Sequence, residues 1–175
     1  MPERRSRAVP NDNTDMQMNG KTPRESEAAL SDLMMPSQAN GLRSPSIFGG
    51  VVMSMVDKCA ALSAMKHCSG QATTLSVERI LFKEPILVGE LVEIRSHVAY
   101  VGRTSMSVVA DVYAENLRTG TRRHTNACWL TFVHLDDEGK PAPVPALILE
   151  TEADRRLHAV AAEMRQRQLA DRNLP

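Results

Sequence analysis

Asp57 is the residue of this chain best placed to do chemistry, because it is the one acid in an apolar segment that follows two glycines. The segment reads IFGGVVMSMVDKC over Ile47–Cys59. Apolar residues recur through it at helical spacing, which predicts a largely buried helix over residues 50–67. A carboxylate among apolar neighbours is costly to bury unless it is paired, reaches a cleft or takes part in a reaction. Asp57 is therefore the first candidate for a general base.

The glycine pair Gly49 and Gly50 supplies the second half of a possible site. A helix start presents unpaired backbone N–H groups and a partial positive charge, and glycine lets a ligand approach closely. At ~1.5 Å rise per residue, Gly50 lies roughly two turns before Asp57. An oxyanion-binding helix start and a base would then share one segment. The alternative is that the glycines form a tight turn and that Asp57 is a satisfied helix residue at a subunit contact.

Other residues give weaker signals for chemistry. The chain has no G-x-S-x-G nucleophile elbow, and Ser54 is interpreted as a helix-packing or substrate-contact residue. The histidines at 67, 97, 124 and 134 fall on different predicted elements and are interpreted as structural or exposed. Arg122 and Arg123 either meet a phosphate or form a solvated strand end. The three cysteines lack paired metal-ligand spacing, so we expect reduced core thiols and no metal site; they are Cys59, Cys68 and Cys128.

The bulk composition limits the classes of partner. With 175 residues, 42% of them hydrophobic, the chain fits one globular domain with tails. Lys plus Arg and Asp plus Glu number 21 each, so no overall charge favours nucleic acid or an anionic membrane. No apolar run approaches the ~20 residues of a membrane helix, and the N-terminus lacks the apolar stretch of a secretory signal. We therefore expect a cytoplasmic protein without nucleic-acid or membrane partners.

Residue patterns outside the glycine segment predict a sheet and a second helix. Residues 1–24 are polar and contain three prolines, which predicts a disordered tail. The segment 27–35 fits either a first strand or a helical turn. Alternating patterns predict strands at 73–82, 90–100, 105–115 and 122–135, with Gly120 at a positive φ in the last hairpin. A proline-rich extended segment follows, and residues 150–172 predict an amphipathic helix.

These elements together indicate an α+β domain. One buried helix is followed by a meander of long strands, an antiparallel sheet of about five strands with one face that the helix can cover. The expected limits are 1–24 for the tail, 25–147 for the domain and 148–175 for the C-terminal helix. Such a sheet leaves its edges open, so we expect subunits to associate.

Six ordered motifs resemble the hot-dog-fold acyl-CoA thioesterases, in particular the cytosolic acyl-CoA hydrolases. They are MPSQAN from Met35, IFGG from Ile47, MSMVD from Met53, SVERILFKEPILVGE from Ser76, YVGRTSMSV from Tyr100 and TNACWLTFVHLDDEGKP from Thr125. The match covers roughly residues 33–147. The resemblance implies a long central helix wrapped by an antiparallel sheet, hydrolysis of acyl-CoA without a cofactor, and a dimer or trimer of dimers with active sites between subunits.

The resemblance also implies roles for particular residues. Asp57 matches the general base or nucleophile, and Gly50 matches the glycine whose N–H polarises the thioester carbonyl. Asn40 matches a loop asparagine that positions water or substrate across the subunit boundary. The loop from Asn40 to Phe48 is about two residues longer than in the family and holds Arg43 and Pro45. The remaining matches are substrate-binding positions: Phe48, Gly49 and Ser54 around the helix, and Gly102, Arg103, Thr104 and Ser105 near the CoA nucleotide.

Two other functions fit the same fold. A non-catalytic acyl-CoA-sensing module would keep the fold and bind the ligand without turnover. A hot-dog hydratase or dehydratase would need a different arrangement of Asp and His on the helix and loop, which the sequence does not offer. The residues thus favour the hydrolase.

Overall fold

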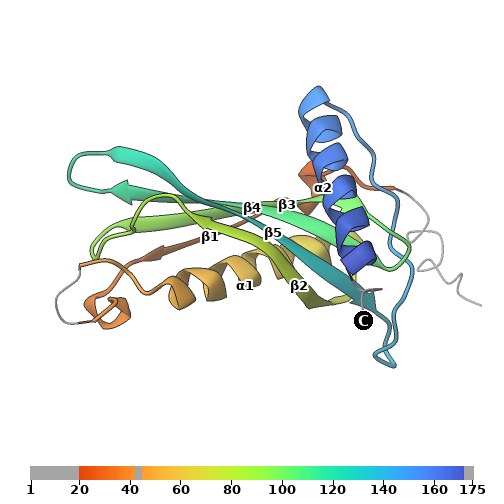
Figure 1. Cartoon of the computed structure of the whole chain (residues 1–175), viewed down its shortest axis with the longest axis horizontal. Helices are drawn as coiled ribbons and strands as arrows, with labels where there is room; N and C mark the ends of the chain where they lie inside the picture. Colours follow the sequence, from red (N-terminus) through yellow and green to blue (C-terminus); the bar gives the residue numbers. More distant parts are fainter. Residues whose placement is uncertain (1–19, 42–44, 172–175) are drawn as a thin grey trace, which may run out of the picture.

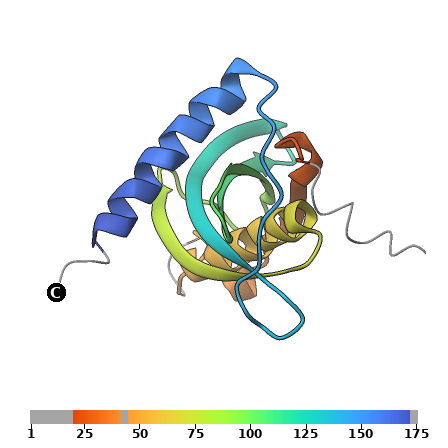
Figure 2. The same ribbon diagram turned by 90° about the vertical axis from the view of Figure 1, so that its right-hand side faces the viewer.

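An antiparallel sheet of five strands curls around one helix in the computed structural model, which describes residues 20–41 and 45–171 (Figure 1). The strands lie in the order β1-β3-β4-β5-β2. Their bounds are β1 Ala28–Leu33, β2 Gln71–Phe82, β3 Leu91–Val101, β4 Ser105–Asn116 and β5 Thr121–Leu135. The helix α1 (Gly49–Cys68) lies in the concave face, and α2 (Glu152–Asp171) lies against the outside of the sheet (Figure 2). The predicted α+β fold, a central helix wrapped by about five strands, is confirmed.

The buried face of α1 follows the predicted spacing. Val52, Val56, Cys59 and Ala60 are almost completely buried against the sheet. Leu62, three positions after Cys59, is instead 46% exposed, because it falls on the flank of the helix. The helix ends at Ser69, whose φ of 54° is left-handed, and Gly70 follows.

The sheet presents alternate side chains to α1. On β3, Val92, Ile94 and Val98 are fully buried, whereas Arg95 points outward and is exposed. The ambiguous segment 27–35 contains a strand, since β1 pairs with β3 from Ala28 opposite Ser96 to Leu33 opposite Leu91. Each fully buried aliphatic or aromatic side chain contributes about 1.5–3 kcal/mol, so this face accounts for most of the hydrophobic stabilisation. Gly120 has a φ of 68°, as its hairpin position predicted.

A short polar network fixes α1 on β3. The hydroxyls of Ser63 and Ser96 lie 2.7 Å apart, and Ser96 donates to the Cys59 carbonyl at 2.9 Å. All three residues are buried, and burial raises the pKa of the Cys59 thiol. Because buried hydroxyls must find partners, this network holds the helix in one position along the sheet. Asp57, one half-turn away, is thereby placed as well.

The chain ends depart partly from expectation. Residues 1–19 of the predicted disordered tail lie outside the described residues. Residues 20–24 are ordered instead: the Lys21 amide donates to the Ala146 carbonyl at 2.8 Å, and a short 3-10 helix, η1, spans Arg24–Ser26. Pairing with a distant segment orders this stretch, which could not fold alone.

The segment 141–147, called here the proline strap, runs extended beneath the end of α1. His134 Nδ1 lies 2.7 Å from the Pro143 carbonyl, and His67 Nε2 lies 3.0 Å from that of Pro145. Two histidines on different elements thus bind the strap, in agreement with their predicted structural role.

The helix α2 begins at Glu152, two residues after the predicted start. Thr151 and Asp154 cap it reciprocally, with bonds of 2.8 and 3.1 Å between each backbone N–H and the other side chain. Ala161 is buried against Ala99 and Val109 on the outer face of the sheet. Neither α1 nor α2 is apolar enough over its length to cross a membrane.

Candidate active site

The first turn of α1 is open toward solvent and tightly built. The Ile47 amide donates to the Ile86 carbonyl at 2.8 Å and the Phe48 amide to that of Gln38 at 2.9 Å, so two other segments set the direction of the helix. A Cβ on Gly50 would lie 2.4 Å from a ring carbon of Phe48, so any side chain there would displace that ring. The first N–H groups of a helix have no acceptor within it. This start can therefore stabilise a developing negative charge.

Asp57 is half-buried on α1 and has a defined partner. The hydroxyl of Thr74, at the start of β2, donates to its Oδ1 at 2.7 Å. The bond orients the carboxylate and leaves the second oxygen free to take a proton from water. Such an arrangement fits a general base.

Asp57 lies on the same face of α1 as Gly50 but not beside it. Seven residues separate them, which is roughly two turns and ~10 Å along the axis. A carbonyl carbon and its oxygen are bonded to each other, so the N–H of Gly50 and the Asp57 of one chain are too far apart to act on one carbonyl.

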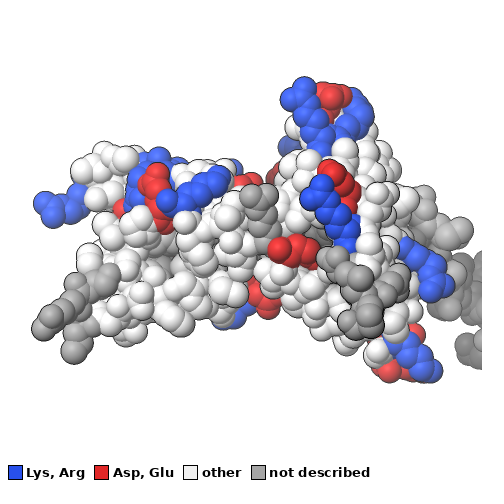
Figure 3. Space-filling model, viewed as in Figure 1, with Lys and Arg blue, Asp and Glu red and all other residues white. Residues whose placement is uncertain are grey.

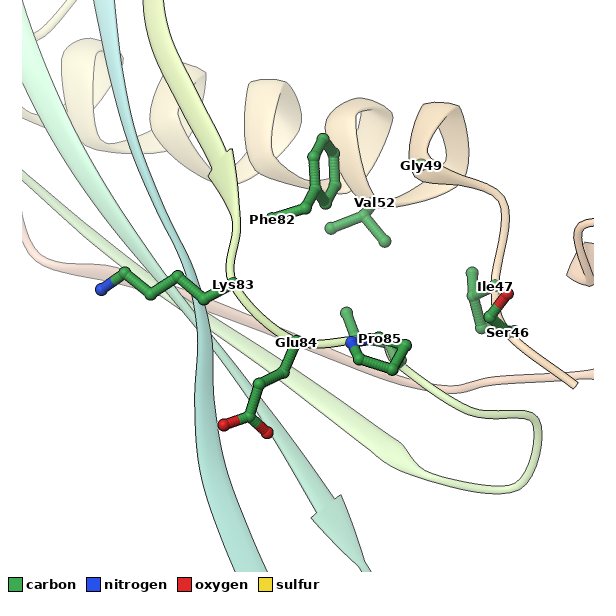
Figure 4. Close-up of a pocket in the computed structure, with 9 residues that line it drawn as sticks. Ser46, Ile47, Gly49, Val52, Phe82, Lys83, Glu84 and Pro85 are labelled. Atoms are coloured by element: carbon green, nitrogen blue, oxygen red, sulfur yellow. The ribbon is translucent and has the colours of Figure 1, made fainter.

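A largely apolar cavity of about 330 Å³ adjoins the helix start (Figure 4). Ile47, Gly49 and Val52 line it on one side, and the segment from Phe82 to Ile86 lines the other. The Phe82 ring would contact a Cβ on Gly49 at 3.3 Å, so the cavity reaches the backbone of the first turn. A chain of several carbons can enter here while its polar end stays at the helix start.

The region with these features matches a known family. The model of the thioesterase superfamily matches residues 45–121, which include the helix start, Asp57 and the cavity wall. An uncharacterised acyl-CoA thioester hydrolase of Bacillus subtilis is 37% identical over 140 residues, which are 80% of each chain. This chain belongs to the acyl-CoA thioester hydrolase family.

Solved structures of acyl-CoA hydrolases share the fold of this family member. The crystal structure of an apo-hexameric acyl-CoA thioesterase superposes with a TM-score of 0.84 at 35% identity, covering 90% of this chain and 100% of that one. An acyl-CoA hydrolase of Staphylococcus aureus, in complex with butyryl-CoA and CoA, gives 0.80 at 32% identity and covers 87% and 92%. The resemblance to the hot-dog thioesterases is confirmed.

Four of the site residues expected for a hydrolase gather at the start of α1. Phe48, Gly49 and Gly50 form it, and Asn40 lies next to it because its amide donates to the Ser46 carbonyl at 2.7 Å. The Asn40 side chain is exposed. Ser54 is exposed on the next turn of α1. Arg43, in the longer loop, lies outside the described residues.

The Gly102–Ser105 turn lies at the other end of the hydrolase domain. Its Gly102 amide donates to the Ser105 carbonyl at 2.7 Å, and the Thr104 carbonyl accepts from His134. The ring of His134 adjoins Gly70, just after α1 ends. Since α1 is ~30 Å long, the turn and the helix start of one chain do not form one site. Arg103 is exposed.

Arg122 and Arg123 are both paired with acids, which neither interpretation from the sequence included. Arg123 binds Glu84 at 2.8 Å and the buried Glu90 at 2.6 Å, and so fixes the cavity wall that follows β2. Arg122 binds Glu93 at 2.8 Å and lies over the Tyr113 ring. Arg122 is exposed at the start of β5, as a solvated strand end would be, whereas Arg123 is half-buried.

Sequence reasoning missed Thr74 and the cavity wall. Thr74 stands in a correctly predicted strand, but it lies on the face toward α1 because it pairs with the buried Phe132 of β5. A pairing partner so distant in the sequence cannot be found from local pattern. Of the wall residues 82–86, only Phe82 falls in a predicted element, at the end of a strand, and no local pattern marks the five as a cavity wall.

Proposed function

We propose that this protein hydrolyses acyl-CoA thioesters to a free fatty acid and CoA. The observation that carries the proposal is Asp57, held by Thr74 on the same helix face as an open helix start with an apolar cavity beside it. Asp57 of one copy takes a proton from water as the water oxygen attacks the thioester carbon, and the N–H of Gly50 in a second copy receives the charge on the carbonyl oxygen. The C–S bond then breaks. The CoA thiolate leaves with little help from an acid.

Attack by the carboxylate itself is the second route through the same residues. It would form an acyl anhydride with Asp57, which water then opens. In either route Asn40 positions water or substrate, while Phe48, Gly49 and Ser54 contact the acyl and pantetheine portions. The turn from Gly102 to Ser105 holds the CoA nucleotide.

The Staphylococcus aureus relative supports the Asp57 and Thr74 pair. Its solved structures include variants in which an asparagine, an aspartate or a threonine is replaced by alanine. The replaced aspartate and threonine of that protein are 17 positions apart, the same separation as Asp57 and Thr74.

A complete site requires two copies of the chain, because within one copy Asp57 lies too far from the N–H of Gly50 at the helix start. The edge strand β2 and the neighbouring flank of α1 expose a series of large apolar residues: Met53, Leu62, Met65, Leu75, Val77, Leu81 and Phe82. Few charged residues interrupt the surface over α1 and β2 (Figure 3). Such an edge and face suit a second copy. We infer a dimer or a trimer of dimers, in which Asp57 of one copy faces the helix start of another.

The reaction proposed here uses no cofactor, because water, a carboxylate and a backbone N–H suffice for it. Within residues 20–41 and 45–171, no group of three His, Cys, Asp or Glu side chains could hold a metal ion. A cytoplasmic location stays a prediction from the sequence.

Release of CoA tests the proposed function directly. Purified protein is incubated with acetyl- to palmitoyl-CoA and a thiol reagent, and we expect the free thiol to appear. Saturable binding without thiol release would indicate an acyl-CoA-sensing module instead. Conversion of enoyl-CoA without thiol release would indicate a hydratase.

A further inference from the structure

Asn126 on β5 is fully buried, yet within the described part of the chain neither polar atom of its side chain is paired. Its exposure is 0%, and its Oδ1 and Nδ2 have no hydrogen-bond partner among the described residues. Buried amides are almost always hydrogen-bonded, because an unpaired one keeps the full cost of leaving water. The unpaired amide of Asn126 therefore needs an explanation, either in the structure or in the function of the protein.

The strand register places Asn126 directly opposite Phe82, a residue that lines the cavity. Asn126 pairs with Phe82 on one side and Val112 on the other, so the three side chains share a face of the sheet. That face is the concave one, because Val112 and Cys128 belong to the core beneath α1. Phe82 lines the cavity, and the Lys83 amide donates to the Thr125 carbonyl at 3.0 Å. Asn126 thus lies on the concave face of the sheet, in the buried layer that adjoins a wall of the cavity.

The buried residues that line the cavity next to Phe82 are apolar. Ile47, Val52 and Ile86, which line the cavity, are at most 7% exposed and carry no polar side-chain atoms. An alkyl chain reaching this layer would leave both amide atoms unpaired. A chain that carries a hydroxyl or keto oxygen could pair with them.

We propose that Asn126 determines acyl specificity by hydrogen-bonding an oxygen on the acyl chain. Its Nδ2 donates to a hydroxyl or keto oxygen, and its Oδ1 accepts from a hydroxyl. Hydroxyacyl or oxoacyl thioesters are then preferred over alkanoyl thioesters of the same length, because a site built to bind a hydroxyl rejects the analogue without it. The inference rests on the proposed hydrolysis of acyl-CoA at the adjoining helix start.

The test compares kcat/KM for 3-hydroxybutyryl-CoA, 4-hydroxybutyryl-CoA and 3-oxobutyryl-CoA with that for butyryl-CoA. At least one oxygenated substrate should be preferred by the wild type, and Asn126→Leu, which has the same branching without polar atoms, should lower that preference by about tenfold or more. Asn126→Val, a smaller apolar change, serves if the leucine variant does not fold. Cys128→Ala, two residues along the same strand face, is the control and should keep the wild-type preference.

Thermal unfolding without substrate gives a second readout. Since Asn126→Leu removes two unpaired polar atoms from the interior, its Tm should equal or exceed that of the wild type. A lower Tm together with equal losses on all four substrates would show a structural role and overturn the inference. A wild type that prefers butyryl-CoA to every oxygenated substrate would overturn it too. Release of CoA from none of them, nor from longer acyl-CoAs, would instead overturn the proposed function.

Discussion

The hydroxyl of Thr74 is the contact that orients the Asp57 carboxylate, at 2.7 Å from Oδ1. Thr74→Val keeps the shape of the side chain and removes the donor. We expect kcat to fall by about tenfold or more with little change in KM, because the base loses orientation rather than substrate contacts. Steady-state kinetics on one acyl-CoA measure this. Thr73→Val, at the exposed neighbouring position, is the matched control, and equal losses in the two variants would argue against a role for Thr74.

Arg103 is expected to bind a phosphate of CoA, because it is an exposed cation on a turn with two hydroxyl residues. Arg103→Ala should raise KM for CoA esters about tenfold or more at low salt while changing kcat little. A pantetheine thioester, which lacks the nucleotide, should be affected much less. Arg118→Ala on the exposed β4–β5 hairpin should change neither substrate. Equal losses on both substrates for Arg103→Ala would point to a structural role.

At the scale of residues, the sequence reveals those functional side chains that neighbouring residues in the chain make conspicuous. Asp57 and the glycine pair stand out because a helix pattern surrounds them with apolar neighbours. Thr74 and Asn126 do not, because their surroundings come from pairing between β2 and β5. The acids that pair with Arg123 lie more than 30 positions away in the sequence and could not be found from local pattern.

His67 joins the end of α1 to the proline strap, and we expect its protonation at low pH to lower the stability of the folded protein. Burial is the main cause that lowers the pKa of His67 below 6.5; Lys21 lowers it further, and the Pro145 carbonyl and Glu25 oppose the change. The folded protein therefore holds this imidazole neutral more strongly than the unfolded chain does. Its contribution to stability is complete above about pH 6.5 and declines as the pH falls below that value.

Thermal unfolding at a series of pH values measures this effect. The wild-type Tm should fall between about pH 7 and pH 5, and His67→Gln should fall less steeply because the titrating group is gone. His158→Gln on α2 is the control and should keep the wild-type slope. Identical slopes for the wild type and His67→Gln would show that another group causes the loss.

At the scale of elements, periodicity predicted both helices and four strands to within two residues. Periodicity failed where pairing with a distant segment of the chain determines the conformation. The segment 27–35 is a strand because β3 pairs with it, and residues 20–24 are ordered because Lys21 pairs with the strap. Leu62 is exposed because the helix packs only one face against the sheet, and the flank that carries Leu62 is left for another contact.

The open edge of β2 is expected to hold two copies of the chain together. Val77→Lys with Leu81→Lys places two charges on this edge, where lysine opposes strand pairing. Light scattering should then give a monomer near 19 kDa, and activity should be lost because the site is shared. Leu117→Lys, the same kind of change on an equally exposed hairpin residue, should leave both unchanged. A wild-type monomer that is fully active would contradict the shared site.

At the scale of the whole molecule, the order of helix and strands indicated one curled sheet around one helix, and that arrangement is confirmed. The sequence also indicated open edges. It could not show that the helix start and the Gly102–Ser105 turn of one chain lie at opposite ends of α1, because the separation depends on how the strands run back along the helix.

The central claim is that Asp57 is the base for thioester hydrolysis, and Asp57→Asn tests it most directly. The change is nearly isosteric, so the fold and the binding of a non-hydrolysable acyl-CoA should persist while kcat falls by at least ~10²-fold. Asp32→Asn, at an exposed position on β1, is the control and should keep full activity. A kcat for Asp57→Asn within a few-fold of the wild type would contradict the account.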